Sequence, residues 1–335
     1  MMEKILARVL SPGGRKGRLS ILIFHRVLVR RDPVLNWDPD AAEFARIISW
    51  LKEWFNFLPL DQAIARLQDN SLPPRAAAIT FDDGYADNFT VAMPILQAHG
   101  LTATFFVATG FLDGGRMWND TVVEAVRRCR KPSLDLSRGD LKVHELGSPD
   151  AVRKAIMSIL NDIKYRDPQE RSKAVDYVAA AAGESLPSDL MLTSEQVKRM
   201  RRAGMQIGAH TVSHPILARL APGEAQAEIA ASKGVLESLL QERVGLFAYP
   251  NGKPNLDYRA VDAEGVRRLG FDAAVTTAWG VADGASDVMQ LPRFTPWDKT
   301  RLRFGARLAK NLLQNSRLRA EQFANAREDG EHDGR

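Results

Sequence analysis

The sequence predicts an α/β protein whose strands run parallel. Six apolar stretches have the length and the branched or aromatic residues that are typical of buried strands. They cover residues 20–29, 76–81, 102–109, 205–210, 246–250 and 271–277. Helical patterns lie between them, and a strand, a helix and a strand in succession form a βαβ unit with parallel strands. Repeated over this length, such units predict either a barrel or a doubly wound sheet.

The helical segments between the strands have recognisable faces and ends. The stretch 41–55 places four large apolar residues on one face of a helix. The stretch 85–100 also has a helical pattern, and Gly100 is expected to end that helix. Further along, Thr193 has a glutamine three residues later, Gln196, which predicts a reciprocal capping box at a helix start.

The chain divides into a central α/β domain and two basic ends. The central domain is expected over residues 19–297, and within it residues 118–192 lose the strand pattern and read as a helical insertion. Residues 1–18 form a basic N-terminal segment. Residues 298–335 are predicted to form a basic amphipathic helix followed by a disordered tail, since seven basic residues and no acidic ones lie between Lys299 and Arg319.

Composition narrows the function classes. The 335 residues are 45% apolar, which is enough for a sizeable core, and the net charge of +5 does not by itself indicate a nucleic-acid partner. The single cysteine, Cys129, excludes a disulfide within the chain and a cysteine-based zinc site. The N-terminus lacks the cleavage signal of a secretory peptide, so we expect a cytoplasmic protein. Its basic ends could associate it with an anionic membrane.

Two adjacent carboxylates follow the predicted strand 76–81. Asp82 and Asp83 precede Gly84, and the simplest interpretation is a polar turn, because Asp-Gly is a common turn pair. Two neighbouring carboxylates repel each other, however, and burying them is costly unless a cation or another partner is present. The residues that follow the other strands decide between these interpretations.

Two histidines supply the second half of a candidate metal site. His210 and His214 follow the predicted strand 205–210, and imidazoles at close spacing suit zinc or another late first-row metal. Either histidine alone would more often be a structural residue than a ligand, and it is the pair at this spacing that raises the metal interpretation to equal standing. Because carboxyl ends of parallel strands meet at one end of the sheet, both segments are expected there. One aspartate could then complete the metal site, while the other takes a proton from a water molecule.

A tight turn follows a third strand in "LFAYPNGKPN". Pro250 and Gly252 predict a bend, which could be an ordinary β-turn. A backbone N–H in such a bend could also donate to a developing oxyanion. Tyr249 and Pro250 are candidate substrate contacts beside it. Trp118, Trp279 and Trp297 are candidate sugar platforms or core residues, which the sequence does not distinguish.

These segments resemble two motifs of the polysaccharide deacetylases, carbohydrate esterase family four. "TFDDG" at 80–84 and "HTVSH" at 210–214 match the family's first and second motifs in full, and the resemblance extends from His25 to Arg293. It implies a distorted (β/α)7 barrel, here with a helical insertion and a basic C-terminal helix. It also implies metal-dependent removal of N-acetyl groups, with Asp83, His210 and His214 as ligands to Zn²⁺ or another divalent first-row metal.

The resemblance implies roles for further residues, and the sequence departs from the family in two places. Asp82 would be the general base and the Asn251 N–H the oxyanion donor. The third motif usually begins with an arginine that orients the base, and this chain has Ala248 there. The C-terminal Leu-x-His motif of the general acid is missing, but "IFH", ending at His25, resembles it at the N-terminus, as in a circularly permuted branch. Arg293 could contact substrate or pair with a carboxylate.

The expected partner is an N-acetylated glycan or a lipid-linked oligosaccharide, without nucleic acid. The same residues could instead serve an O-acetyl esterase or an amide hydrolase with a non-sugar substrate. A catalytically weak glycan-binding protein is a further alternative.

Overall fold

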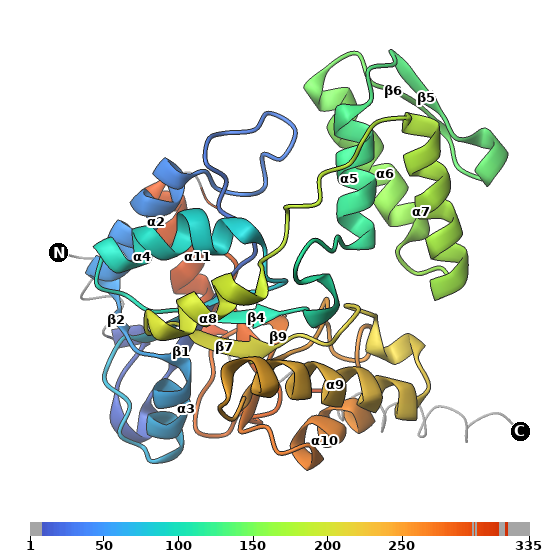
Figure 1. The fold of residues 1–335 in the computed structure, drawn as a ribbon. Coiled ribbons are helices and arrows are strands. Elements are labelled where there is room, and N and C mark those ends of the chain that lie inside the picture. The colour runs from blue at the N-terminus through green and yellow to red at the C-terminus, as the bar shows by residue number, and fades with distance from the viewer. Residues whose placement is uncertain (1–8, 297, 299, 315–318, 321–335) are drawn as a thin grey trace, which may run out of the picture.

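The computed structural model describes residues 9–296, 298, 300–314 and 319–320. Within this part of the chain, an α/β fold is built around a nearly closed barrel of seven parallel strands (Figure 1). The predicted α/β class is therefore confirmed. In sheet order the strands are β1 (Leu19–Phe24), β3 (Ala76–Phe81), β4 (Thr104–Val107), β7 (Gln206–Ala209), β8 (Leu246–Ala248), β9 (Ala273–Trp279) and β10 (Leu291–Arg293).

The first and last strands of the barrel lie side by side. The Phe294 N–H donates to the carbonyl oxygen of Ile21 at 2.8 Å, and the Ile23 N–H donates to the carbonyl oxygen of Phe294 at 3.0 Å. A short additional strand, β2 (Asn56–Phe57), pairs with the start of β3. Every residue of β1 and β3 is buried, which explains why both read as unbroken apolar runs rather than as alternating patterns.

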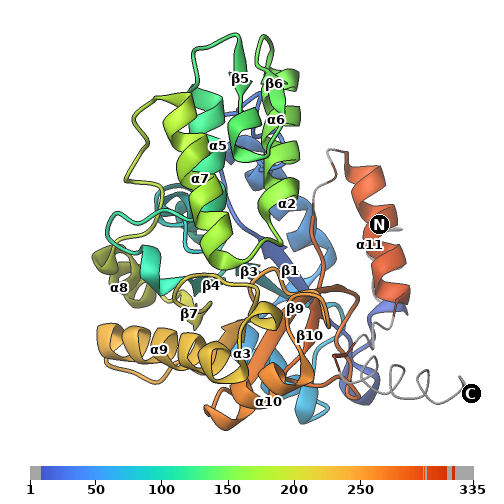
Figure 2. The ribbon, with the colours of Figure 1, turned by 90° about the vertical axis from the view of Figure 1, so that its right-hand side faces the viewer.

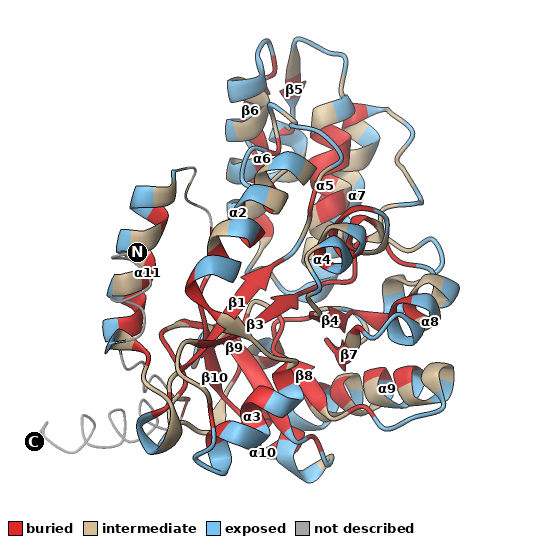
Figure 3. Ribbon diagram, turned by 90° about the vertical axis from the view of Figure 1, so that its left-hand side faces the viewer, coloured by how far each residue is buried: buried red, intermediate tan, exposed pale blue. Residues whose placement is uncertain are grey.

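Helices surround the barrel and turn their apolar faces toward it (Figure 3). The predicted helix at 41–55 is α2, and it buries the expected face. The predicted capping box is also present, because the side chains of Thr193 and Gln196 each accept from the backbone N–H of the other. These helices are α2 (Ala41–Trp54), α3 (Leu60–Gln68), α4 (Met93–Ala98), α8 (Ser194–Arg202), α9 (Pro222–Leu240) and α10 (Ala260–Arg268).

The helix predicted at 85–100 is shorter and irregular. A π-helical turn, η2 (Asn88–Ala92), comes before α4, and the chain leaves the helix near Gly100 with φ of +66°. Pro94 cannot donate the usual hydrogen bond to the carbonyl of residue 90, and its ring crowds that carbonyl. A widened turn before the proline relieves both problems.

The insertion forms a separate layer over one end of the barrel (Figures 1 and 2). It contains α5 (Trp118–Arg128), α6 (Pro149–Ile163) and α7 (Pro168–Ala182), which close on their own apolar core. The sequence pattern suggested no strand here, and this was wrong. An antiparallel hairpin joins α5 to α6 through β5 (Ser133–Asp135) and β6 (Val143–Glu145). Each strand has only three residues, too few for a periodic pattern to be recognised.

The basic amphipathic helix corresponds to α11 (Arg301–Leu313), which packs beside the barrel (Figure 2). Phe304 is fully buried and lies 5.5 Å from the ring of Trp54 and 6.3 Å from that of Phe294. Most of the apolar face is therefore used for packing, although Leu302 and Leu313 are exposed. Contact with an anionic membrane stays a prediction. The expected tail at 321–335 and residues 1–8 lie outside the described residues.

Among the helices that the structure describes, none combines the length and apolarity needed to cross a membrane.

Candidate metal and catalytic site

Three of the predicted site residues lie together at the carboxyl end of the barrel strands. Asp83 follows β3 and His210 follows β7, with β4 between them in the sheet. Asp83 Oδ1 lies 3.3 Å from His210 Nε2 and 3.4 Å from His214 Nε2. The three candidate ligand atoms all lie within 4.8 Å of one another. The parallel sheet thus brings together residues that are more than 120 positions apart in sequence.

This cluster fits a tetrahedral divalent ion. Two ligand atoms, each about 2.1 Å from a tetrahedral metal, lie about 3.4 Å apart, close to the spacing between the carboxylate and the two imidazoles. Asp83 Oδ1 is buried and has no hydrogen-bond partner among the described residues. His210 Nδ1 lies 2.7 Å from the carbonyl oxygen of Ala248, which favours a proton on Nδ1 and leaves Nε2 free to bind a metal.

The charges in the cluster shift one another's pKa values. Burial raises the pKa of Asp83, but the adjacent imidazoles of His210 and His214 outweigh it, so the net shift is downward. Burial lowers the pKa of His214 to about 4, although Asp83 opposes the shift. A carboxylate and a neutral imidazole are the forms in which these side chains bind metals.

The backbone at these ligands is in an unusual conformation. Asp83 has φ of +77° and His214 has φ of +53°, a left-handed region that costs about 1–2 kcal/mol for residues other than glycine. The loop that carries His214 is fixed by Glu228 of α9, whose carboxylate accepts from the backbone N–H groups of Val212 and Ser213, each at 2.9 Å. Neighbouring structure therefore holds the ligands in their strained positions.

Asp82 faces a different partner. Its carboxylate accepts two hydrogen bonds from Arg293, at 2.7 Å from Nη1 and at 2.6 Å from Nη2. Arg293 is 1% exposed and also donates to the Thr276 carbonyl oxygen at 2.7 Å. Burial raises the pKa of Asp82, but the charge of Arg293 outweighs it and leaves the pKa lowered. Of the two roles expected for Arg293, the structure shows the pairing with a carboxylate, and contact with substrate stays an untested prediction.

This pair also bears on the departure seen in the third motif. Ala248 cannot orient an aspartate, but Arg293 reaches Asp82 from the last barrel strand. The two residues are 211 positions apart, and no sequence spacing links them. The only sequence signal for this contact was that Arg293 is a basic residue at the end of a short apolar stretch. That signal allowed either pairing with a carboxylate or contact with substrate.

His25 and Asn251 border the same end of the barrel. His25 is exposed directly after β1, and the Asn88 side chain donates to its carbonyl oxygen at 2.8 Å. Phe24, the residue before His25, pairs with Phe81, the residue before Asp82, in the parallel register of β1 and β3, so His25 and Asp82 leave neighbouring strands side by side. Asn251 has φ of +59°, and within the described residues its N–H has no hydrogen-bond acceptor.

The other candidate contacts with substrate are less accessible. Tyr249 is fully buried, stacked on Tyr258 with 3.9 Å between ring centroids, and Pro250 is buried as well. Arg171 lies over the Trp118 ring at 5.2 Å. Trp279 packs against Phe294 at 5.6 Å. Trp118 and Trp279 are half-buried, and a role of these residues in binding substrate stays a prediction. Trp297 lies outside the described residues.

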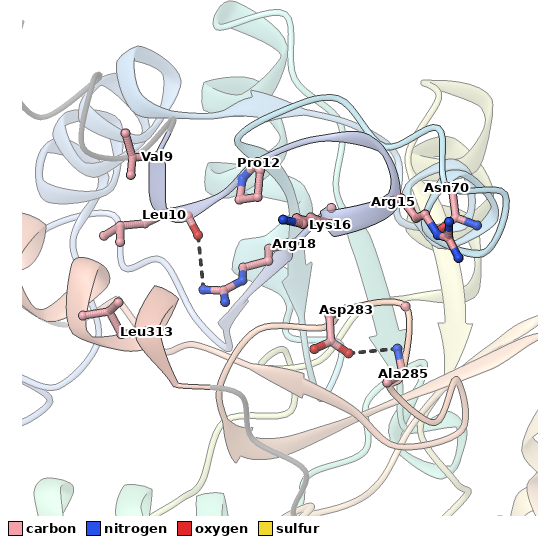
Figure 4. A pocket seen from close by; sticks show the side chains of 12 residues that line it. Val9, Leu10, Pro12, Arg15, Lys16, Arg18, Asn70, Asp283, Ala285 and Leu313 are labelled. Carbon is pink, nitrogen blue, oxygen red and sulfur yellow. Dashed lines mark hydrogen bonds between the residues drawn. The ribbon is translucent and has the colours of Figure 1, made fainter.

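A pocket of about 670 Å³ lies at the amino ends of the barrel strands, the end away from the metal site. Figure 4 shows the residues that line it. Arg15, Lys16 and Arg18 line it just before β1, and Asp283 lines it shortly before β10. Arg18 donates to the backbone carbonyls of Leu10 and Leu312. This pocket is at the amino ends of the strands, where barrels carry stabilising contacts more often than chemistry.

Comparisons with known proteins identify the family. Residues 69–137 and 168–273, together more than half of the chain, match the family described as polysaccharide deacetylase. The Bacillus subtilis (strain 168) protein YxkH is 22% identical over 281 residues, covering 83% of this chain and 71% of that protein.

Two solved structures share the fold. One is the Streptococcus pyogenes deacetylase PplD in complex with acetate, with a TM-score of 0.58 and 21% identity, covering 89% of this chain and 100% of that one. The other is a de-N-acetylase from Aggregatibacter actinomycetemcomitans, with a TM-score of 0.53 and 16% identity, covering 83% of this chain and 94% of that one. With both sequence motifs joined in one site, the chain belongs to the polysaccharide deacetylase family.

Proposed function

We propose that this protein is a metal-dependent hydrolase that removes N-acetyl groups from an amino-sugar-containing glycan or a lipid-linked polysaccharide precursor. The observation that carries the proposal is the pairing of two adjacent aspartates with different partners. Asp83 lies between two imidazoles in a spacing that suits a divalent ion, and Asp82 is held by Arg293. Such a division gives one carboxylate to the metal and keeps the other ionised for proton transfer.

Zn²⁺ or another divalent first-row ion, held by Asp83, His210 and His214, would supply a Lewis acid that activates water and polarises the acetyl carbonyl. Asp82 takes a proton from the attacking water, whose oxygen forms the new bond to the carbonyl carbon. The Asn251 N–H donates to the oxygen on which negative charge develops. His25 gives a proton to the amine nitrogen as the C–N bond breaks, so the products are acetate and a free amine.

The accessibility of His25 and Asn251 supports these two roles. His25 is exposed, and it leaves β1 directly beside the point where Asp82 leaves β3. The Asn251 N–H is not used by the fold within the described residues. The names of PplD, a deacetylase, and of the Aggregatibacter de-N-acetylase support acetyl removal as the reaction.

The test is acetate release from a panel of N-acetylated and O-acetylated glycans, including lipid-linked ones. We would compare zinc-loaded protein, chelated protein and the Asp82→Asn variant, and measure bound zinc in each. We expect release from N-acetylated glycans that needs both the metal and Asp82, while Asp82→Asn still binds zinc. Release from O-acetylated substrates alone would favour an esterase. Zinc binding without acetate release from any substrate would contradict the proposal and favour a glycan-binding protein.

A further inference from the structure

The helix α11 has a second apolar stripe, on the face turned away from the barrel. Leu302 is 80% exposed and Leu313 is 66% exposed. Their separation in sequence brings them within about 20° of three full helical turns, so the two side chains lie on the same face. Ala306, which is also exposed, lies between them on that face. The helix packs on the barrel through other residues, which are Phe304, Leu308, Asn311 and Leu312.

Basic side chains flank this stripe along one side. Arg303 and Lys310 are exposed, and both lie about 80–100° around the helix from Leu302. In the part of the chain that the structure describes, neither of them pairs with a carboxylate. The helix itself contains no acidic residue that could neutralise them. The outward face of α11 therefore combines exposed leucines with unneutralised positive charge.

The pocket at the amino ends of the strands continues this surface past the end of α11 (Figure 4). Leu313 lines the pocket together with Val9, which is 70% exposed, and with Arg15 and Lys16. Arg15 and Lys16 are exposed, and neither forms an ion pair with a described residue. Asp283 is the one acid among the described lining residues, and its carboxylate accepts hydrogen bonds within its own turn. The lining thus carries an excess of positive charge.

Arg18 fixes the two parts of this surface to each other. Its guanidinium donates to the backbone carbonyl oxygens of Leu10, in the N-terminal segment, and of Leu312, near the end of α11. A cation at the carboxyl end of a helix is also stabilised by the partial negative charge there. We call the joined surface the α11 face. It comprises Val9, Arg15, Lys16, Leu302, Arg303, Ala306, Lys310 and Leu313.

The chemistry of the α11 face distinguishes between possible partners. Exposed aliphatic side chains flanked by lysine and arginine are the combination that binds at the interface of an anionic bilayer. A second copy of the chain is disfavoured, because a two-fold contact would bring the same basic side chains opposite each other. A protein partner is also disfavoured, since charged residues are depleted at the centre of protein interfaces.

We propose that the α11 face lies on the surface of a bilayer that contains anionic lipids. Val9, Leu302 and Leu313 enter the headgroup region, and the basic side chains lie beside the lipid phosphates. This binding goes beyond the proposed deacetylation and does not depend on it, because the α11 face shares no residue with the candidate metal site.

The experiment measures co-sedimentation of the full-length protein with vesicles that carry no glycan. One set contains phosphatidylcholine alone, and the other also contains phosphatidylglycerol as the anionic lipid. We expect binding to the anionic vesicles and little binding to the neutral ones. Arg303→Gln/Lys310→Gln should lower the partition coefficient about 25-fold, because each basic residue near an anionic surface contributes about fivefold. Leu302→Ser/Leu313→Ser should lower it about tenfold through lost apolar contact.

Each double variant has a control with the same kind of change elsewhere on the surface. Arg138→Gln/Lys154→Gln removes two exposed charges from the insertion, and Val143→Ser/Val235→Ser removes two exposed apolar side chains. Both controls should change partitioning less than about twofold, since distant exposed charges are screened by salt.

Three results would overturn the proposal. They are absent binding to anionic vesicles, binding that neither α11 variant weakens, and binding that the controls weaken as much as the α11 variants do. Sedimentation velocity without vesicles tests the other occupant. A dimer that Leu302→Ser/Leu313→Ser dissociates, without any vesicle binding, would assign the α11 face to a second copy of the chain instead.

Discussion

The carboxyl end of the barrel and the helical insertion use their residues differently. At the barrel end, Asp83, His214 and Asn251 adopt left-handed backbone conformations, and charged groups are buried there in pairs. In the insertion, α6 and α7 begin at side-chain caps, Ser148 and Asp167, and the helices close on aliphatic residues. The difference teaches that the candidate chemistry lies where strained backbone and the buried Asp82–Arg293 pair meet, whereas the insertion, with a larger share of regular helix, covers that end of the barrel.

The largest effect is expected from removing Arg293, the partner of the buried Asp82 carboxylate. Arg293→Met should lower the free energy of unfolding by about 3–5 kcal/mol, because Asp82 is left as an unpaired buried charge. The double variant Arg293→Met/Asp82→Asn should recover a substantial part of that loss, without recovering acetate release. Urea unfolding of metal-free protein measures both variants. If the double variant is no more stable than Arg293→Met alone, the unpaired charge of Asp82 is not the cause of the lost stability.

A core substitution in the insertion should lower the stability of the insertion without changing metal binding at the barrel end. Ile156 is fully buried in the core of the insertion, so Ile156→Ala should cost about 2–5 kcal/mol of unfolding free energy through lost burial and a cavity. Zinc affinity, measured against a chromophoric chelator under folding conditions, should change less than about twofold. Val143→Ala on exposed β6 is the control, with an expected change under about 0.5 kcal/mol. A parallel loss of zinc affinity would mean that both regions form one cooperative unit.

The junction between the regions should respond to pH through Asp120. Asp120 of α5 accepts a hydrogen bond from the Tyr85 hydroxyl of the barrel at 3.0 Å, and burial raises its folded pKa to about 7, above its unfolded value. Asp120 therefore stabilises the fold at low pH, and this contribution is lost as the pH rises through about 7. Relative to Asp120→Asn, the wild-type protein should lose about 2 kcal/mol of unfolding free energy between pH 5.5 and 8.5 without metal. A stability difference that does not vary with pH would show that Asp120 titrates normally.

The smallest effect is expected at the point where the chain leaves the insertion. Thr193→Ala removes the side chain that accepts from the Gln196 N–H, and it should cost about 1 kcal/mol. Thr193→Ser keeps the acceptor and should lie close to the wild-type protein in thermal unfolding. Equal losses in both variants would assign the effect to the methyl group of Thr193 instead.

Local patterns predicted the elements, and long-range contacts were harder to predict. The strand 76–81, the capping box of Thr193 and the metal cluster all followed from short motifs and from the rule that parallel strands share one carboxyl end. The strand β10 was missed because it has three residues and contains Pro292. The pairing of Arg293 with Asp82 depends on barrel closure, which no local pattern encodes.

The contact between Asp82 and Arg293 also sets an order in which the site is completed during synthesis. Asp83, His210 and His214 have all been added once residue 214 is in place, whereas the partner of Asp82 is added 79 residues later. A growing chain can therefore contain every candidate metal ligand while Asp82, the proposed base, still lacks the arginine that holds it. The last barrel strand thus completes the fold and the site in a single step, and a chain that stops before residue 293 would carry the ligands without a positioned base.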